Sequence, residues 1–368
     1  MRLRLVALVL VVLAHAAPVP RLVVGYRFDD HAAPLYDACI FPGEFKSRYG
    51  LFLREVARHE QYDLYDGSRP LLFLSLRPGD TDSAVLQALL SGSSDVGILA
   101  AEPVMRARLD GKPVRVIAAL ERRGDMLVVN ESVPASDWVG FVKWVKARTR
   151  PVVVGYAGRE SMTLLGFEQA LEYENIRYSR DSLDPKAQVR LVGTKPGPGT
   201  ELRPGRLDAA VLSEPAATLA GSEPGNRVIT SIDTLPPNRF EDRPGTVIAA
   251  TDSGIRARGP DIGRFLELMG VATHYANNRT HNTLVAATRW LGTSPQFEST
   301  AMVHIGYSSM PDRAFRNGLW NWYFALRLKG QVPDSLSGFM DRDEWLGIPY
   351  DSSLVGPALD RAGTRIIR

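Results

Sequence analysis

Short β-branched apolar runs alternate along the chain with segments whose apolar residues recur at helical spacing. Residues 19–26 predict a first strand, and residues 35–48 predict a helix that ends at Gly50. The alternation indicates a mostly parallel α/β sheet covered by helices, and from residue 262 onward the pattern becomes mainly helical. Further strands are expected at residues 71–76, 96–99, 113–120, 126–129, 151–156, 188–192, 227–231 and 246–250, and further helices at 83–90, 138–147, 161–174 and 315–329.

Two segments in different halves of the chain repeat one pattern. Residues 90–103 and residues 205–215 are each interpreted as a helix that ends at a glycine, a short strand and a Glu-Pro turn. An aspartate, Asp95 or Asp208, introduces each strand. The repeat predicts two similar α/β lobes with a cleft between them, which suits a protein that closes around a small molecule. Residues 194–204, rich in Pro and Gly, predict an exposed loop.

The amino terminus has the pattern of a cleavable secretory signal. Arg2 and Arg4 precede the unbroken apolar run 5–13, and small residues suited to cleavage follow at 14–16. An apolar run of this length is about half of what a membrane-spanning helix needs. We therefore expect residues 1–17 to be removed and the mature protein to be periplasmic or extracellular; an uncleaved interfacial anchor is the alternative.

Composition and motifs exclude several functional classes. The formal charge is +3, with no run of Lys or Arg, which gives no support for a nucleic-acid partner. The single cysteine, Cys39, rules out an intramolecular disulfide and is interpreted as a buried small hydrophobe rather than a catalytic thiol. There is no nucleophile elbow, phosphate loop or zinc-ligand spacing. We therefore expect no catalytic residue, no cofactor and no metal.

Candidate binding residues follow from the rule that ligands of open α/β sheets bind beyond the carboxyl ends of the strands. The rule selects the loops 29–33, 100–102, 122–125 and 157–161. In the last of these, a glycine-containing turn meets a helix start at Ser161, where backbone N–H groups favour an anion. Arg159 could add charge-assisted hydrogen bonds to a carboxylate, sulfonate or phosphate. An ordinary helix cap beside a solvated arginine is the alternative.

His31, Glu102 and Glu214 have two interpretations each. His31 follows two aspartates, but adjacent residues in a turn rarely point at one ion, so a ligand contact or a turn-stabilising role is preferred to a metal site. Glu102 and Glu214 occupy equivalent places in the two repeats. They could face the cleft or hydrogen-bond the turn or hinge, and we prefer the second role for at least one of them.

The order and spacing of several stretches resemble the solute-binding proteins of bacterial and archaeal ABC importers. The resemblance is to the branch that handles nitrate, sulfonate, taurine, bicarbonate and thiamine-pyrimidine-like solutes. The stretches are the signal and residues 45–51, 88–97, 111–117, 205–211 and 265–277. The resemblance implies a two-lobed type II periplasmic-binding fold, each lobe a mostly parallel sheet flanked by helices, with a helical C-terminal tail. It also implies a monomer that works with an ABC permease and ATPase in the membrane.

By position, the resemblance assigns residues 18–124 and 246–368 to lobe I and residues 125–245 to lobe II, with crossings near Gly124 and Gly245. It brings Ser213 and Glu214 to the cleft. The implied ligand-binding residues are Asp30, His31, Ala32, Ala101, Glu102, Arg122, Asp125, Gly158, Arg159, Ser161, Ser213 and Glu214. The charged stretch 122–125 departs from common members of the family.

An anionic or zwitterionic solute is the preferred ligand because arginines and a helix amino terminus lie among the candidates. The aromatic residues Tyr26, Phe28 and Tyr156 could sandwich a ring, so a heterocyclic solute is the alternative. The alternative functions are a sensory receptor of the same fold and, less favoured, an enzyme similar to the pyrimidine synthases of thiamine biosynthesis. Those synthases carry a cysteine-rich motif, whereas this chain has Cys39 alone.

Overall fold

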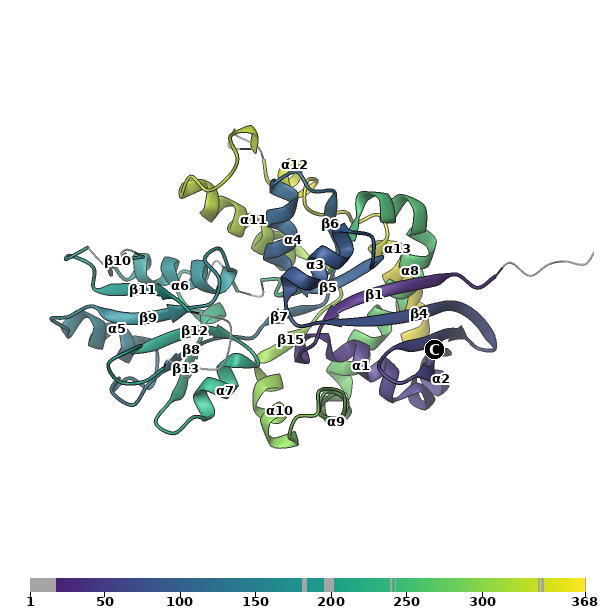
Figure 1. The fold of residues 1–368 in the computed structure, drawn as a ribbon, viewed down its shortest axis with the longest axis horizontal. Coiled ribbons are helices and arrows are strands. Elements are labelled where there is room, and N and C mark those ends of the chain that lie inside the picture. The colour runs from purple at the N-terminus through teal and green to yellow at the C-terminus, as the bar shows by residue number, and fades with distance from the viewer. Residues whose placement is uncertain are drawn as a thin grey trace, which may run out of the picture.

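A computed structural model of the chain describes residues 18–180, 184–194, 202–238, 240–241, 243–336, 338 and 341–367. Two separate sheets form its two halves and lie side by side in Figure 1, each with helices packed on it. The expected signal segment 1–17 and most of the expected loop 194–204 lie outside the described residues. In the part of the chain that the structure describes, no helix has the length and apolar character to cross a membrane.

The first half is built on a seven-stranded sheet with the order β2-β3-β4-β1-β5-β14-β6. Its strands are β1 (Arg21–Arg27), β2 (Leu51–Ala57), β3 (Gln61–Asp66), β4 (Arg69–Gly79), β5 (Val96–Ala100), β6 (Val114–Ala119) and β14 (Thr246–Thr251). The centre, β4-β1-β5, is parallel, whereas β2, β3 and β14 pair antiparallel with their neighbours. The sheet is therefore more mixed than expected, because a hairpin and a strand returning from the other half both join it.

The second half contains a six-stranded sheet with the order β10-β11-β9-β12-β8-β13. Its strands are β8 (Asp125–Val129), β9 (Val152–Tyr156), β10 (Tyr178–Ser179), β11 (Val189–Gly193), β12 (Ala209–Ser213) and β13 (Arg227–Ser231). The helices of this half are α5 (Trp138–Ala147), α6 (Met162–Tyr173) and α7 (Ala216–Ser222). The neighbours β10, β11, β9 and β12 are parallel, so their carboxyl ends share one edge of the sheet.

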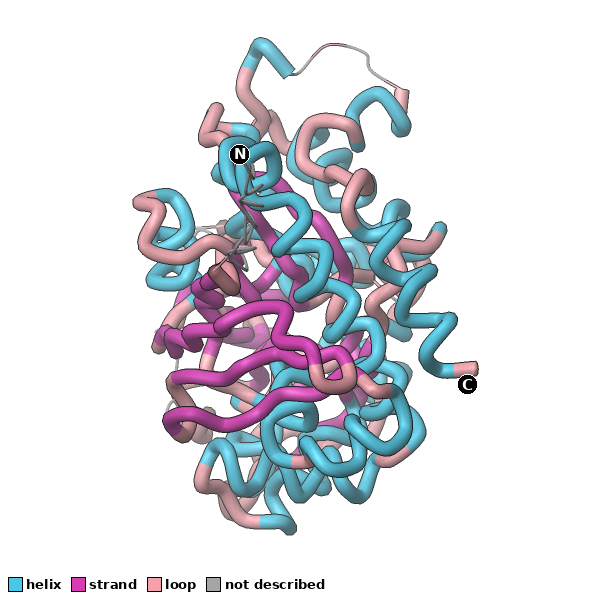
Figure 2. Tube along the Cα trace, turned by 90° about the vertical axis from the view of Figure 1, so that its right-hand side faces the viewer, coloured by secondary structure: helices cyan, strands magenta, loops and turns pink. Residues whose placement is uncertain are grey.

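The remaining helices belong mainly to the first half and to the expected helical tail. They are α1 (Ala33–Ile40), α2 (Pro42–Tyr49), α3 (Asp82–Leu90), α4 (Ala101–Leu109), α8 (Asp252–Asn278), α9 (Thr280–Leu291), α10 (Pro295–Ala301), α11 (Arg313–Leu328), α12 (Arg342–Leu346) and α13 (Val355–Ile366). Figure 2, viewed from the side of the seven-stranded sheet, shows the strands as a layer with these helices beside it.

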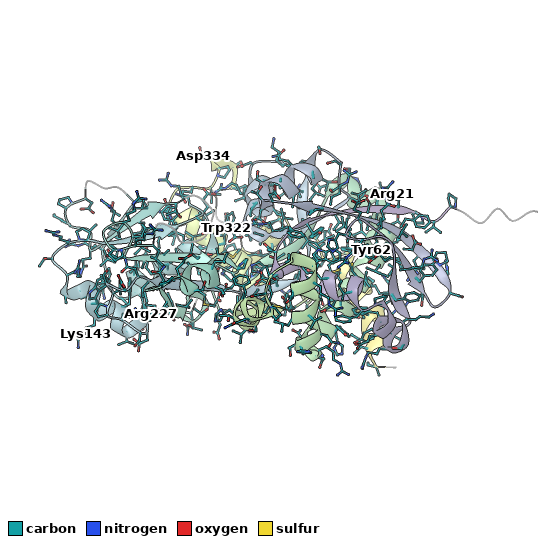
Figure 3. The ribbon with its side chains drawn as sticks, turned by 60° about the horizontal axis from the view of Figure 1, so that its bottom comes forward. Arg21, Tyr62, Lys143, Arg227, Trp322 and Asp334 are labelled. Atoms are coloured by element: carbon teal, nitrogen blue, oxygen red, sulfur yellow. The ribbon has the colours of Figure 1, made fainter. Side chains whose placement is uncertain are left out.

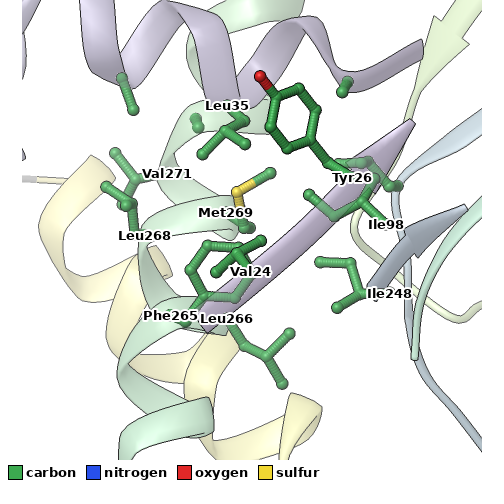
Figure 4. Packing of buried hydrophobic residues seen from close by; sticks show 14 of the residues in the cluster. Val24, Tyr26, Leu35, Ile98, Ile248, Phe265, Leu266, Leu268, Met269 and Val271 are labelled. Atoms are coloured by element: carbon green, nitrogen blue, oxygen red, sulfur yellow. The ribbon is translucent and has the colours of Figure 1, made fainter. Parts of the chain in front are cut away.

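The core of the first half forms where the sheet meets α8. Val24 of β1, Ile98 of β5 and Ile248 of β14 are fully buried and pack against Phe265 and Met269 of α8, as Figure 4 shows. Burying one such side chain stabilises the fold by about 1.5–3 kcal/mol. This packing explains why β-branched runs in the sequence predicted strands correctly. Cys39 is buried in the same cluster and is a free thiol, as expected.

One expectation about the segment between β1 and β4 is wrong, and two strands in it were not predicted. The expected helix 35–48 is two helices, α1 and α2, which meet at Phe41 because Pro42 has no N–H to continue the first helix. Gly50 does end α2, with a positive φ of 67°. The strands β2 and β3 were not predicted. Their buried and exposed positions alternate only partly, and charged residues interrupt both of them.

The internal repeat has a structural counterpart in its aspartates. Asp95 donates its N–H to the carbonyl of Val23 at 2.8 Å, and its Oδ2 accepts the N–H of Val23 at 2.7 Å. Asp208 makes the same pair of hydrogen bonds with Val153, both at 2.8 Å. Each aspartate thus holds the start of the parallel strand beside its own, β1 in one half and β9 in the other.

Other parts of the repeat differ from the prediction. The Glu-Pro turn is confirmed in the second repeat only: Glu214 and Pro215 form a turn before α7, whereas Glu102 lies in the first turn of α4. Proline fits at such helix starts because the first N–H groups of a helix have no partner within it. Gly205 has a positive φ of 85° but lies in a turn rather than at a helix end, since residues 203–206 are not helical.

The chain passes between the two sheets twice, along one path. It leaves through β7 (Glu121–Arg123) and returns through residues 243–245, where Gly245 donates its N–H to the carbonyl of Glu121 at 3.0 Å. Gly124 has a positive φ of 87°, and a Cβ at Gly245 would overlap the carboxylate of Glu121. A short strand, β15 (Ile305–Tyr307), pairs with β7 beside the first passage.

Candidate functional site

The loops that follow the strands of the two sheets meet each other, as the sequence predicted. We call this contact region the seam, and we define it as residues 27–33, 100–102, 121–125, 157–163, 213–214 and 243–245. Side chains from both halves of the molecule are buried in it. The definition includes the twelve residues implied as ligand contacts, and their contact with a solute stays a prediction.

His31 joins the two halves through both nitrogens of its ring. Its Nε2 lies 2.8 Å from the carbonyl oxygen of Glu214, and its Nδ1 lies 3.2 Å from Oε2 of Glu121. The carbonyl oxygen of Glu214 accepts a hydrogen bond from Nε2, whereas the contact of Nδ1 with Glu121 is at ion-pair distance without hydrogen-bond geometry. Burial by itself would lower the pKa of His31, but the carboxylates of Glu121 and Asp29 raise it well above 6.5.

The carboxylate of Glu214 is occupied by the protein itself. Oε2 accepts the N–H of Thr218 at 2.9 Å, Oε1 accepts the Thr218 hydroxyl at 3.1 Å, and Nδ1 of His304 lies 2.6 Å from Oε1. Glu214 therefore caps the start of α7 and binds the segment before β15. This is the turn-stabilising role that we preferred for at least one of the paired glutamates. The sequence did not indicate a role for His304, because no residue close to it in the chain forms a motif with it and its partner Glu214 is 90 residues away.

Two buried aspartates precede His31. Oδ1 of Asp29 accepts the N–H of His31 at 3.2 Å. The side chain of Asp30 is fully buried, and neither of its carboxyl oxygens has a hydrogen-bond partner among the described residues. Burial raises the pKa of Asp30 from 3.8 to about 8, against the lowering effect of His31. Asp30 is therefore mostly protonated at neutral pH. No three His, Cys, Asp or Glu side chains in the described part of the chain could hold a metal ion.

The amino terminus of α6 does receive an anionic group, but the group comes from the protein. Oε1 of Glu102, in the other half of the molecule, accepts the N–H of Met162 at 2.8 Å. Ser161 caps the helix by accepting the N–H of Leu164 at 3.2 Å, and its own hydroxyl donates to the carbonyl of Gly158. Burial raises the pKa of Glu102, while Arg243 and the hydrogen bond from Met162 lower it. The predicted anion site is thus filled by Glu102.

Several other candidates are also engaged in internal contacts. Nη2 of Arg122 lies 2.9 Å from Oδ2 of Asp312, and it donates to the carbonyl of Met310. The hydroxyl of Ser213 donates to Oδ1 of Asp125 at 2.5 Å, and Asp125 also pairs with Arg243. Sequence reasoning missed Arg243 because it lies in a connector. Ala32 and Ala101 are buried, and Ala101 contributes its N–H to the carbonyl of Gly245.

An open cavity of about 860 Å³ lies where β9, β10 and β11 end, and one predicted residue, Arg159, lines it. Its other walls include Tyr156, Arg180, Arg190, Leu191 and Gly193. The guanidinium of Arg180 lies 5.8 Å from the ring centre of Tyr156. Arg180 was missed because β10, which it follows, is only two residues long and the sequence did not indicate it.

Comparisons with known proteins agree with this fold. A model of the NMT1-like family matches residues 16–291. The ligand-binding component of an ABC-type import system from Staphylococcus aureus superposes with a TM-score of 0.68 at 13% identity, covering 92% of this chain and 99% of that one. The periplasmic nitrate-binding protein NrtA from Synechocystis superposes with a TM-score of 0.67 at 12% identity, covering 96% of this chain and 92% of that one. The aliphatic sulphonate-binding protein SsuA from Escherichia coli superposes with a TM-score of 0.60 at 14% identity, covering 87% of this chain and 91% of that one.

These matches confirm the expected resemblance and the expected two-lobed fold. At these identities the likeness establishes the fold. Nitrate and sulphonate are the solutes named for two of the similar proteins.

Proposed function

The chain belongs to the NMT1-like family, and from this premise we propose that it is the exported solute-binding component of an ABC importer. In this proposal, residues 18–124 and 246–368 form lobe I and residues 125–245 form lobe II. A small anionic or zwitterionic solute is trapped between the lobes by hinge closure. The protein then acts as a monomer and delivers its solute to a permease and ATPase in the membrane.

The observation that carries the proposal is the paired passage between the sheets. The two chain segments run side by side, joined by the hydrogen bond from Gly245 to Glu121 and by an antiparallel bridge between Arg122 and Pro244. Two adjacent strands of this kind form a natural hinge, because a few backbone angles can rotate one half against the other. The positive φ of Gly124 places a residue of high conformational freedom on that path.

The other contacts of the seam can open and close. His31 reaches Glu214, and Glu102 reaches Met162, through single hydrogen bonds. Beside them, the indole N–H of Trp322 donates to the carbonyl of Glu160 at 2.7 Å, and Figure 3 shows Trp322 between the two halves. A solute that touches both lobes would add to these contacts and shift a pre-existing equilibrium toward the closed form.

A thermal-shift screen of residues 18–368 tests the proposed function. The panel holds nitrate, bicarbonate, taurine, alkyl sulfonates, amino acids and pyrimidines at constant ionic strength. A solute at a hundred times its Kd stabilises the folded protein by about 2.7 kcal/mol, which raises the melting temperature by several degrees. We expect one acidic class to give this shift. A well-folded protein that no member of the panel stabilises would contradict the proposed function.

A further inference from the structure

We propose that the arginine-lined cavity at the ends of β9, β10 and β11 binds the acid group of the solute. We further propose that the solute is an organic acid with an apolar body, such as a sulfonate or carboxylate, rather than a bare inorganic anion. This inference rests on the proposed function and adds to it a site and a substrate class. Arg159, Arg180 and Arg190 face the same cavity, and none of the described residues that line it is acidic.

One of the arginines, Arg180, is already held in an ion pair. Nε and Nη2 of Arg180 lie 2.8 and 2.7 Å from Oε1 of the buried Glu168. The ammonium of Lys329, in lobe I, lies 2.9 Å from the other oxygen of the same carboxylate. Arg180 is therefore a wall of the cavity, held in place by an ion pair and by the Tyr156 ring.

Arg159 and Arg190 retain their positive charges. Among the described residues, no acidic side chain pairs with either of them, and the buried Nε of Arg190 has no hydrogen-bond partner. Two like charges around one cavity repel each other, and an anion between them would relieve this repulsion. Arginine donors arranged in a fork also match the oxygens of a carboxylate, sulfonate or phosphate.

The size of the cavity and its apolar wall favour an organic acid. Its volume of about 860 Å³ falls within the range of about 300–1,000 Å³ that is usual for small-molecule sites. A nitrate or bicarbonate ion would fill a small part of it. Leu191, Val192 and the Tyr156 ring supply apolar surface beside the arginines.

The cavity is also connected to the other lobe. Lys329, at the end of α11, reaches Glu168 and the hydroxyl of Tyr178, which lies 3.1 Å from its ammonium. A lobe I residue thus contacts the ion pair that holds Arg180 in the cavity wall. A solute bound on the arginines would lie near this contact, which links the cavity to the position of lobe I.

Isothermal titration calorimetry of residues 18–368 tests the inference, with benzenesulfonate, methanesulfonate and nitrate as probes. We expect saturable binding of benzenesulfonate and at least tenfold weaker binding of nitrate. The variants R159Q and R190Q should each weaken benzenesulfonate binding at least tenfold, the size expected for one charged hydrogen-bonding partner. R177Q, which removes an exposed arginine outside the cavity, is the matched control and should bind like the wild type.

Arg190 lies within β11, so R190Q could lose binding because it fails to fold. A second variant at this position separates the two causes. R190K keeps the charge but not the forked donor, and it should give an affinity between those of R190Q and the wild type. Failure of all three probes to bind, or equal binding by wild type, R159Q and R190Q, would overturn the cavity inference. A panel solute that stabilises wild type and R190Q equally would leave the transport role intact while excluding this cavity. Binding at the cavity without any change between the lobes would instead contradict hinge closure.

Discussion

The imidazole of His31 donates from Nε2 to the carbonyl oxygen of Glu214 at 2.8 Å, which ties the loop after β1 to the end of β12. The same ring lies 3.2 Å from the carboxylate of Glu121, beside the passage between the sheets. One buried histidine therefore connects the two halves of the molecule and the passage between them. In the proposed closure, a motion of one half against the other must break this contact or move with it.

Replacing His31 should loosen the seam. We expect H31Q to lower the free energy of unfolding by about 3 kcal/mol at pH 6, because the buried carboxylate of Glu121 loses its cationic partner. The pKa of His31 is raised in the folded protein, so its contribution is fully present below the unfolded value of 6.5 and declines as the pH rises through the folded pKa. Urea unfolding at pH 6 and pH 9 measures both effects. H281Q, at an exposed histidine of α9, is the control. Equal stability of H31Q and wild type at pH 6 would refute this role.

Asp30 should make the protein less stable as the pH rises. Its pKa is about 8 in the folded protein and 3.8 when unfolded, so between these values the folded state binds the extra proton. The free energy of unfolding then falls with pH, by at most about 1.4 kcal/mol per unit for this group. D30N, which stays neutral, should remove that part of the slope and exceed the wild type in stability at pH 9. D80N, at an exposed aspartate, should leave the slope unchanged, and a wild-type slope in D30N would disprove the assignment.

Glu102 should be replaceable by a small carboxylate. We expect E102A to destabilise the protein by about 1–2 kcal/mol, because the N–H of Met162 loses its acceptor at the start of α6. Formate could then occupy the vacated place and should raise the melting temperature of E102A more than that of wild type, with chloride matching the ionic strength. E60A, at an exposed glutamate, controls for general salt effects. An identical response to formate in E102A and wild type would argue against an anion site at this helix terminus.

The duplicated aspartates should matter for stability in both halves. Asp208 holds Val153 at the start of β9 through two hydrogen bonds, and D208A should cost about 1–2 kcal/mol. D95A should cost at least as much, since Asp95 also pairs with Arg258 at 3.2 Å. Chemical denaturation of both variants beside the exposed control D80A measures the difference. If D208A proves as stable as D80A, the aspartate does not hold the strand.

Local pattern predicted most of the sheet but not all of its strands. Runs such as 96–99 and 246–250 are apolar because both faces of a central strand are covered, and such runs are visible in any sequence. The strand β3 was not predicted because it carries a buried charge, Asp63, which pairs with Arg54 across the hairpin. That compensation comes from another strand and leaves no periodic signal.

The strand-end rule selected loops from topology alone, and of their residues His31 lies in the seam and Arg159 lines the cavity. That these residues bind a solute stays a prediction. The rule could not show that Glu102 fills the start of α6, since that carboxylate arrives from the other sheet. Arg190 was missed for a similar reason: its charge has meaning only once β11 lies beside β9.

The most direct test of the account is a distance measurement between the two lobes. Spin labels on S68C, in the exposed turn between β3 and β4, and on K143C, on α5, would report the lobe separation by pulsed electron resonance in a C39A background. We predict a broad distance distribution in the free protein that narrows to its shorter part with saturating benzenesulfonate or a panel solute that stabilises the protein. A distribution that such a bound solute leaves unchanged would contradict hinge closure.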